Sequence, residues 1–255
     1  MPGFPEHGLP ETVLNTFVLF CRIGACLMVM PGPSSPRVPV QVRLYLAISI
    51  TLALAPLLLA SMASPVAMNS AGRTLAVAAS ETLIGASFGL VIRLFFLALQ
   101  FAGVLIAASI GFSGLTQPSI EESEASPALG TVLTLTATVL LFVTGQHLEV
   151  LAALIETYAF LPVGEPIERE LGLSRLADAM VEAFHLALRI ASPFVVYSIL
   201  INLLLGIMNR LVPQMAVYFI STPLVIFGGW NVFHGSIDDM LRLFGSVFSQ
   251  WLSRF

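Results

Sequence analysis

The chain has 255 residues, of which 57% are hydrophobic and only 10% are charged. Soluble domains contain roughly 45–50% apolar and roughly 25% charged residues, so the composition excludes a water-soluble monomer. The net charge is −4, and every basic residue is an arginine, scattered from Arg22 to Arg254 without a cluster that could follow a phosphate backbone. Nucleic-acid binding is therefore not expected. The two cysteines, Cys21 and Cys26, are five residues apart in an apolar run and predict neither a disulfide framework nor a metal site.

Several apolar runs reach the length of about 20 residues that a helix needs to cross a hydrocarbon layer about 30 Å thick. Backbone groups in lipid must be satisfied internally, so these runs predict helices and an all-α, multi-pass membrane fold of long helical hairpins. The predicted spans are Val13 to Met30, broken only by Arg22, then Leu44 to Ala63, Ala125 to Gln146, Ile190 to Asn209 and Leu211 to Phe233.

The first apolar run is interpreted as a retained span and not as a cleaved signal peptide. Glu6 and Glu11 precede it where a signal peptide carries basic residues, and no clear small-x-small cleavage site follows. Arg37 and Arg43 indicate a cytoplasmic loop after this span, but the acidic loop around Glu121 leaves the orientation open.

A run from Leu75 to Gly111 is too long for a simple span, because its 37 residues would form a helix of about 55 Å. It must break, tilt strongly or leave the bilayer inside a protein assembly. A stripe of small residues recurs along it at intervals of four, and its first part begins at Glu81 and ends at Arg93, which carry opposite charges. Small residues at this spacing let helices approach closely. This stripe predicts either a subunit contact or packing within the chain, and it consists of Glu81, Gly85, Gly89, Arg93, Gly103, Ala107 and Gly111.

Other ionisable residues at membrane depth should face protein or water. His147 and Glu149 predict either a proton relay or, more simply, a hydrated helix end. Arg22, Arg189 and Arg210 are interpreted as buried partners or interface anchors more readily than as ion-pathway residues.

Two amphipathic helices are expected beside the last hairpin. From Ser174 onward, one face carries Leu176, Met180, Phe184 and Leu188. From Ser236, which has capping-box spacing to Asp239, another apolar face follows: Leu241, Phe244, Phe248, Trp251 and Phe255. Each helix would lie on the bilayer surface or pack on a partner helix.

The segment Gly111 to Gly114 reads G-x-S-G, the nucleophile motif of rhomboid intramembrane proteases. The context argues against a protease, because Ser113 is followed by Pro118 and two glutamates, which are typical of a loop. The long polar loop from Gly111 to Pro127 predicts either a pore constriction or a solvated surface loop.

An ordered set of residues resembles the FliR family of flagellar biosynthetic proteins, the FliR/SctT-type export-gate subunits of type III secretion. The resemblance covers nearly the whole chain and departs at Ala216, where the family pattern has Asn. The residues that carry it include Arg22, Gly24, Pro39, Arg43, Glu81, Gly85, Gly89, Gln100, Gly103, Gly111, Gly145 to His147, Leu161 to Gly164, Pro193, and the run Arg210, Leu211, Val212, Pro213 and Gln214.

The resemblance implies one membrane-embedded domain over residues 1–255, FliP-like to about residue 175 and a FliQ-like hairpin from about residue 176. It implies FliP-type, FliQ-type, FlhA-type and FlhB-type partners in the bacterial inner membrane, within the flagellar basal body, and no cofactor, metal or catalytic residue. It also implies that one loop plugs the pore at rest and moves aside for unfolded flagellar proteins, and this plug would contain Gly111, Phe112, Ser113, Gly114, Leu115, Thr116, Gln117 and Pro118.

The expected function is therefore structural and gating, not enzymatic. Two other classes stay open at this point. A solute transporter or channel would act as a monomer and would show inverted repeats, which the sequence lacks. An intramembrane serine protease would depend on Ser113.

Overall fold

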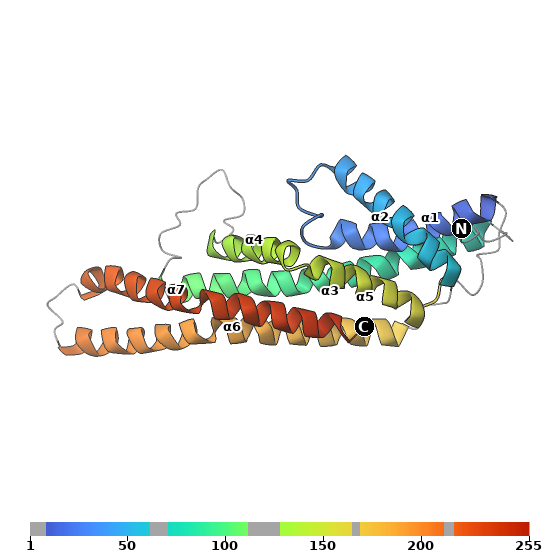
Figure 1. Cartoon of the computed structure of the whole chain (residues 1–255). Helices are drawn as coiled ribbons and strands as arrows, with labels where there is room; N and C mark the ends of the chain where they lie inside the picture. Colours follow the sequence, from blue (N-terminus) through green and yellow to red (C-terminus); the bar gives the residue numbers. More distant parts are fainter. Residues whose placement is uncertain (1–8, 62–70, 112–127, 165–168, 212–216, 255) are drawn as a thin grey trace. The chain divides into compact units, whose positions relative to one another are not determined.

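A computed structural model describes residues 9–61, 71–111, 128–164, 169–211 and 217–254 (Figure 1). In these ranges the regular structure is entirely helical, which confirms the all-α prediction. The helices are α1 (Leu9–Val29), α2 (Val40–Ser61), α3 (Ala71–Ser109), α4 (Ala128–Val143), α5 (Gln146–Phe160), α6 (Arg169–Leu211) and α7 (Val217–Leu252).

Among the described helices, α1, α2, α3 and α6 are long and apolar enough to cross a membrane. A fifth span results if α4 and α5 together make one. The predicted span Ala125 to Gln146 ends earlier than expected, at Val143 of α4, because Gly145 adopts a left-handed φ of 78° and separates α4 from α5. The predicted span Leu211 to Phe233 is described only in part, because residues 212–216 lie outside the described ranges, and α7 is not among the candidate spans.

Backbone contacts divide the chain into two units. The first contains α1, α2, α5, residues 71–94 of α3 and the first part of α6. The second contains residues 95–109 of α3, α4, most of α6 and most of α7. Helices α3, α6 and α7 therefore contribute to both units.

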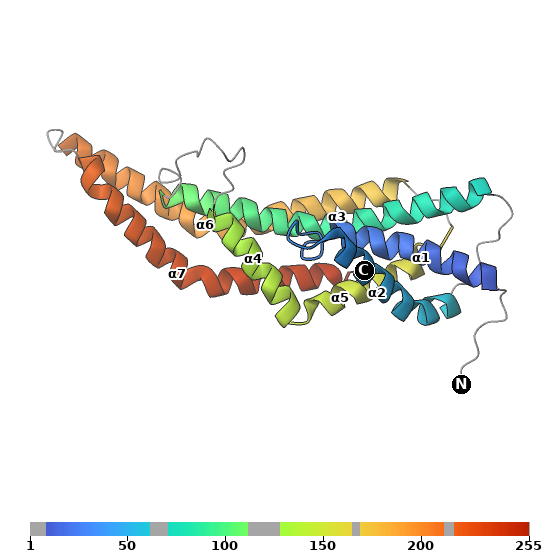
Figure 2. The same ribbon diagram turned by 90° about the horizontal axis from the view of Figure 1, so that it is seen from above.

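Helix α3 is continuous over 39 residues, or about 58 Å. This excludes the expected possibility that the run from Leu75 breaks. In the second unit α4 runs obliquely to α3 (Figure 2), and the two helices meet at Gly103 and Gly130. Apolar side chains of α3 are fully buried in both units, which makes this helix the centre of each core: Ile92, Phe95, Leu99, Ala102 and Ile106.

The two expected amphipathic helices do not exist as separate elements. Each continues into the neighbouring apolar run, so that α6 has 43 residues and α7 has 36 residues. Pro193, close to the first junction, lies inside α6 without ending it, and α7 stays helical through Ser236, where the second amphipathic helix was expected to begin.

The C-terminal apolar face packs inside its own chain. In the second unit the ring of Phe244 lies edge-on to Phe96, and that of Phe248 lies edge-on to Phe95. In the first unit Trp251 contacts Phe88. The corresponding face of α6 differs, because its alanines turn inward while Met180 and Phe184 are 57% and 54% exposed.

Candidate functional site

The candidate site is a cluster around one arginine buried in an apolar helix. The side chain of Arg22 lies in the middle of α1 and is 0% exposed. Because the residues around it in α1 are apolar, its charge must be compensated by other helices. Glu81 of α3 does this, and its side chain is 1% exposed.

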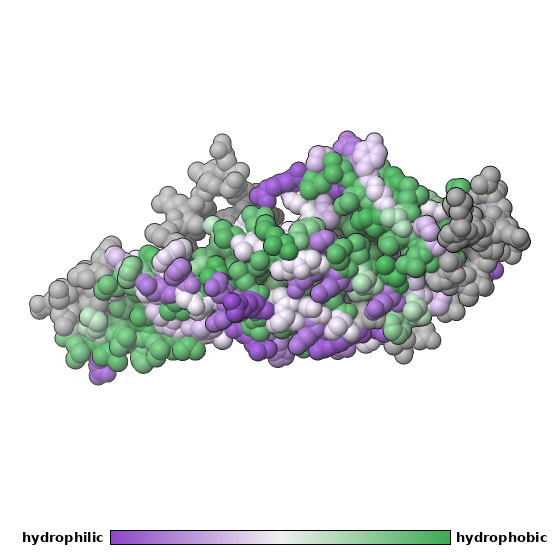
Figure 3. All heavy atoms as spheres, in the orientation of Figure 1, coloured by the Kyte–Doolittle hydropathy of each residue, from purple (hydrophilic) through white to green (hydrophobic). Residues whose placement is uncertain are grey.

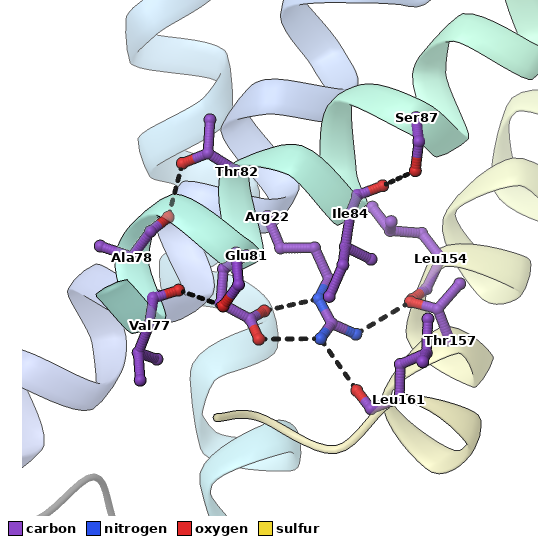
Figure 4. A network of polar contacts seen from close by, with 11 residues as sticks. Arg22, Val77, Ala78, Glu81, Thr82, Ile84, Ser87, Leu154, Thr157 and Leu161 are labelled. Atoms are coloured by element: carbon purple, nitrogen blue, oxygen red, sulfur yellow. Dashed lines mark hydrogen bonds and ion pairs between the residues drawn. The ribbon is translucent and has the colours of Figure 1, made fainter. Parts of the chain in front are cut away.

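Three helices meet at Arg22 (Figure 4). Its Nε donates to Oε2 of Glu81 at 2.6 Å, and its Nη2 donates to Oε1 at 3.0 Å, which forms a bidentate pair. Nη1 donates to Oγ1 of Thr157 at 3.3 Å, and Nη2 also donates to the carbonyl of Leu161 at 2.9 Å, just beyond α5. One guanidinium thus connects α1 with α3 and with the C-terminal end of α5, where helix carbonyls attract a positive charge.

An aromatic ring completes this cluster. The Tyr158 ring centroid lies 4.0 Å from Cζ of Arg22, within the range of a cation–π interaction. We call the side chains of Arg22, Glu81, Thr157 and Tyr158, with the Leu161 carbonyl, the Arg22 anchor. The arrangement neutralises the charges of Arg22 and Glu81 and connects α1, α3 and α5.

The glycines of α3 let α1 come close to the anchor. A Cβ atom at Gly85 would lie 2.0 Å from the carbonyl oxygen of Arg22, and one at Gly89 would lie 2.7 Å from that of Cys26. Since Cβ atoms essentially never approach so closely, only glycine permits this helix contact. The close backbone contact and the ion pair therefore depend on the same separation of α1 and α3.

A second close contact lies between α3 and α4 in the second unit. A Cβ atom at Gly103 would lie 2.4 Å from Cα of Gly130, and one at Gly130 would lie 2.8 Å from the carbonyl oxygen of Gln100. Ala107 is buried. The predicted small-residue stripe thus faces helices of the same chain at Gly85, Gly89 and Gly103, whereas Arg93 is exposed.

Only the first residue of the predicted plug loop is described. Gly111 follows α3 with a left-handed φ of 81° and is exposed. Phe112 to Pro118 lie outside the described residues. Beside Gly111, the second unit has a cleft of about 290 Å³ formed by α3, α6 and α7. Its polar lining consists of Ser109, Ser198, Asn202, Ser221 and Thr222.

The remaining family-signature residues are dispersed. Arg43 of α2 donates to the carbonyls of Val38 at 3.0 Å and Ser35 at 2.6 Å, so it fastens the loop before its own helix. Pro39 precedes α2. Pro193 and Arg210 are exposed on α6. Pro213 and Gln214 lie outside the described residues, as does Ala216.

The residues considered for proton transfer or proteolysis do not come together. His147 and Glu149 occupy the first turn of α5, where His147 is half-buried and Glu149 is exposed. Ser113 lies outside the described residues, while His185 and His234 are exposed on α6 and α7. No cluster of metal-ligating side chains occurs in the described ranges.

Sequence reasoning identified Arg22 and Glu81 separately but did not pair them. It also missed Thr157, Tyr158 and Gly130. The single helpful signal was that α1 and α3 each carry a charge of opposite sign in an apolar stretch, and two such charges can neutralise each other. At the C-terminal end of α5, Leu161 was singled out only as part of the family resemblance, and no pattern linked it to Arg22.

The sequence matches the family described as bacterial export proteins, family 1, over residues 13–251. It is 29% identical over 240 residues to the flagellar biosynthetic protein FliR of Caulobacter vibrioides, covering 93% of this chain and 94% of that protein. It is 32% identical to FliR of Escherichia coli, covering 80% and 77% respectively. Similarity extends to the secretion system apparatus protein SsaT of Salmonella typhimurium, at 28% identity over 59% of this chain and 58% of that protein.

Proposed function

The chain belongs to family 1 of the bacterial export proteins and is of the FliR type, and from that membership we propose that it is a structural and gating subunit of the flagellar type III export gate. The observation that carries this proposal is the match over residues 13–251, which includes both units of the structure. Five relatives are named flagellar biosynthetic protein FliR, which favours the flagellar system over a virulence system.

The exposed apolar surface supports membership of an assembly in the membrane. Within the apolar part of α6 only 17% of residues are buried in the chain, compared with 56% for α3. Hydrophobic atoms accordingly gather on α6 and on α2 in Figure 3. Such surfaces must be covered by lipid or by other proteins. FliP-type, FliQ-type, FlhA-type and FlhB-type proteins of the bacterial inner membrane are the proposed partners, and unfolded flagellar proteins are the proposed cargo.

The proposal includes the division of the chain suggested by the resemblance, with a FliP-like part to about residue 175 and a FliQ-like hairpin from about residue 176. The proposal also holds that the chain is not an enzyme. Neither a solute transporter nor a serine protease is supported by the relatives, whose names describe flagellar biosynthesis and secretion.

Deletion of the gene is expected to abolish flagellar filaments and swimming, because a missing gate subunit blocks export of filament proteins. Electron microscopy and soft-agar motility measure this result, and a plasmid copy should restore both. A motile deletion strain in a bacterium with a single secretion system would contradict the proposal. Co-purification with two other small membrane proteins would distinguish the gate from a transporter that acts as a monomer.

Shortening the loop between Gly114 and Ser126 is expected to increase leakage of ions and small molecules across the inner membrane, if this loop closes the pore at rest. Dye uptake by cells that contain the assembled gate measures the leak. The wild-type chain and a shortened loop with its length restored by Gly and Ser serve as controls. A mutant gate that assembles but does not leak would contradict the role of this loop as a plug. It would not contradict the proposed role of the chain in export.

A further inference from the structure

A polar cleft lies in the second unit, between the end of α3 and the apolar parts of α6 and α7. Its volume is about 290 Å³, which is room for several water molecules. None of the described residues that line it is charged. Its polar lining consists of hydroxyl and amide side chains from all three helices: Ser109 of α3, Ser198 and Asn202 of α6, and Ser221 and Thr222 of α7.

Two contacts hold the three helices around this cleft. Oη of Tyr197 in α6 donates to the carbonyl of Val225 in α7 at 2.7 Å. A Cβ atom at Gly229 of α7 would lie 2.5 Å from Cβ of Ile110, directly after α3, so only glycine permits this close approach. Because these contacts connect α6 and α3 to α7, the space between the three helices belongs to the fold.

The cleft opens at a depth where lipid surrounds a spanning helix. Helix α6 has one uncharged stretch long enough to cross the hydrocarbon layer, the 20 residues between Arg189 and Arg210. Ser198 and Asn202 come eight and twelve residues after the first residue of this stretch, or about 12 Å and about 18 Å along its length of about 30 Å. Both polar side chains therefore lie near its middle.

The two sides of α6 differ in polarity at this depth. Ser198 and Asn202 are one turn apart, and Nδ2 of Asn202 donates to Oγ of Ser198 at 3.2 Å, which leaves Oδ1 of Asn202 as a further acceptor. Leu200 is 55% exposed and, at 100° per residue, lies about 160° around the helix from each of them. Lipid offers a polar side chain no hydrogen bond, so the cleft side of α6 is suited to water and the opposite side to lipid.

Uncharged hydroxyl and amide groups suit an extended polypeptide. Each residue of a polypeptide except proline has one backbone donor and one backbone acceptor, and hydroxyl and amide groups can both donate and accept. Such hydrogen bonds do not depend on the sequence or the charge of the polypeptide. Unfolded proteins of different sequence can therefore use the same cleft, as a path for many exported proteins requires.

We propose that the polar cleft is a water-filled part of the export path through the gate and that it contacts the backbone of unfolded cargo. This inference rests on the proposed function, since it needs a gate through which unfolded proteins pass. It adds to that function by assigning one face of α6 and α7 to the path. The opposite face of α6, which carries Leu200, is left to lipid or to other proteins.

Cysteine labelling in native membranes measures whether the cleft holds water. Ser198→Cys, Asn202→Cys and, as the control at the same depth, Leu200→Cys are introduced into the full-length chain in a strain that lacks its own copy. A positively charged methanethiosulfonate reagent is added from both sides of the membrane. Because the reagent attacks a thiolate, which forms in water and not in lipid, we expect labelling at the two cleft positions to be at least about tenfold faster than at Leu200. The wild-type chain gives the background from Cys21 and Cys26.

A cargo that stops inside the gate tests the contact with polypeptide. A flagellar export protein fused to a domain that does not unfold would block the path midway. We expect this stalled cargo to slow the labelling of Asn202→Cys several-fold and to leave that of Leu200→Cys unchanged. A photo-crosslinker in place of Asn202 should join the chain to the cargo, whereas one in place of Leu200 should not.

Labelling of Asn202→Cys as slow as that of Leu200→Cys would overturn this inference, because the cleft would then hold no water. Fast labelling that the stalled cargo does not slow, or a crosslinker at Asn202 that does not reach the cargo, would also overturn it, because the cleft would then lie outside the path. If a cysteine on α6 prevents folding, Thr222→Cys on α7 provides the same measurement. A deletion strain that still exports flagellar proteins would instead overturn the proposed function.

Discussion

Replacing Arg22 by Leu is expected to destabilise the chain by about 3–5 kcal/mol, the usual cost of breaking a buried ion pair by removing one partner. The substitution leaves the carboxylate of Glu81 inside an apolar core, with its side chain 1% exposed and without its bidentate donor. It also removes the donors to Thr157 and Leu161, so the C-terminal end of α5 loses its connection to α1.

Thermal unfolding of the detergent-solubilised full-length chain measures this effect. Arg242→Leu is the matched control, because Arg242 is exposed on α7 and its replacement should change stability little. The double variant Arg22→Leu with Glu81→Leu should recover much of the loss, since an apolar pair leaves no buried charge. Equal stability of Arg22→Leu and the wild type would refute the role of the Arg22 anchor.

Gly85→Ala is expected to separate α1 from α3, although it adds a single methyl group. The new Cβ atom would lie 2.0 Å from the carbonyl oxygen of Arg22, and this backbone atom cannot move away without moving α1. Overpacking of this kind costs about 1–3 kcal/mol, and the Arg22–Glu81 pair weakens at the same time. The expected result is a lower thermal midpoint and a lower yield of the folded chain.

Gly72→Ala is the control in the same helix. No heavy atom lies within 4 Å of a Cβ atom at Gly72, so alanine should be neutral or favourable there through its higher helix propensity. Replacement of glycine by alanine is thus expected to lower stability at Gly85 and to leave it unchanged or raise it at Gly72. If Gly85→Ala were as stable as Gly72→Ala, the close approach of α1 and α3 would not be needed for stability.

These two experiments probe one contact. The Arg22 backbone carbonyl faces Gly85, while the Arg22 side chain binds Glu81 one turn earlier in α3. Substitutions at sites that share a contact are not additive. The combined Gly85→Ala and Arg22→Leu variant should therefore lose less stability than the sum of the two single losses.

Much of the architecture follows from the order of apolar residues alone. Runs long enough to cross lipid must be helical because their backbone groups can be satisfied only internally, and this determines the all-α membrane fold without any tertiary information. The ordered residues from Arg22 to the run at Arg210 were also sufficient to recognise the family. The need to neutralise Arg22 and Glu81 was evident for the same reason, since each is an ionisable side chain in an apolar stretch.

Tertiary structure alone decided which groups meet. Arg22 and Glu81 are 59 residues apart in the sequence, and Arg22 and Thr157 are 135 apart, so no local pattern could pair them. The apolar face of α7 packs on Phe95 and Phe96 of α3, whereas Met180 and Phe184 on the similar face of α6 stay more than half exposed, although Phe184 stacks on Phe101 of α3. Periodicity determines that a helix has an apolar face, but the partner of that face depends on the packing of helices distant in the chain.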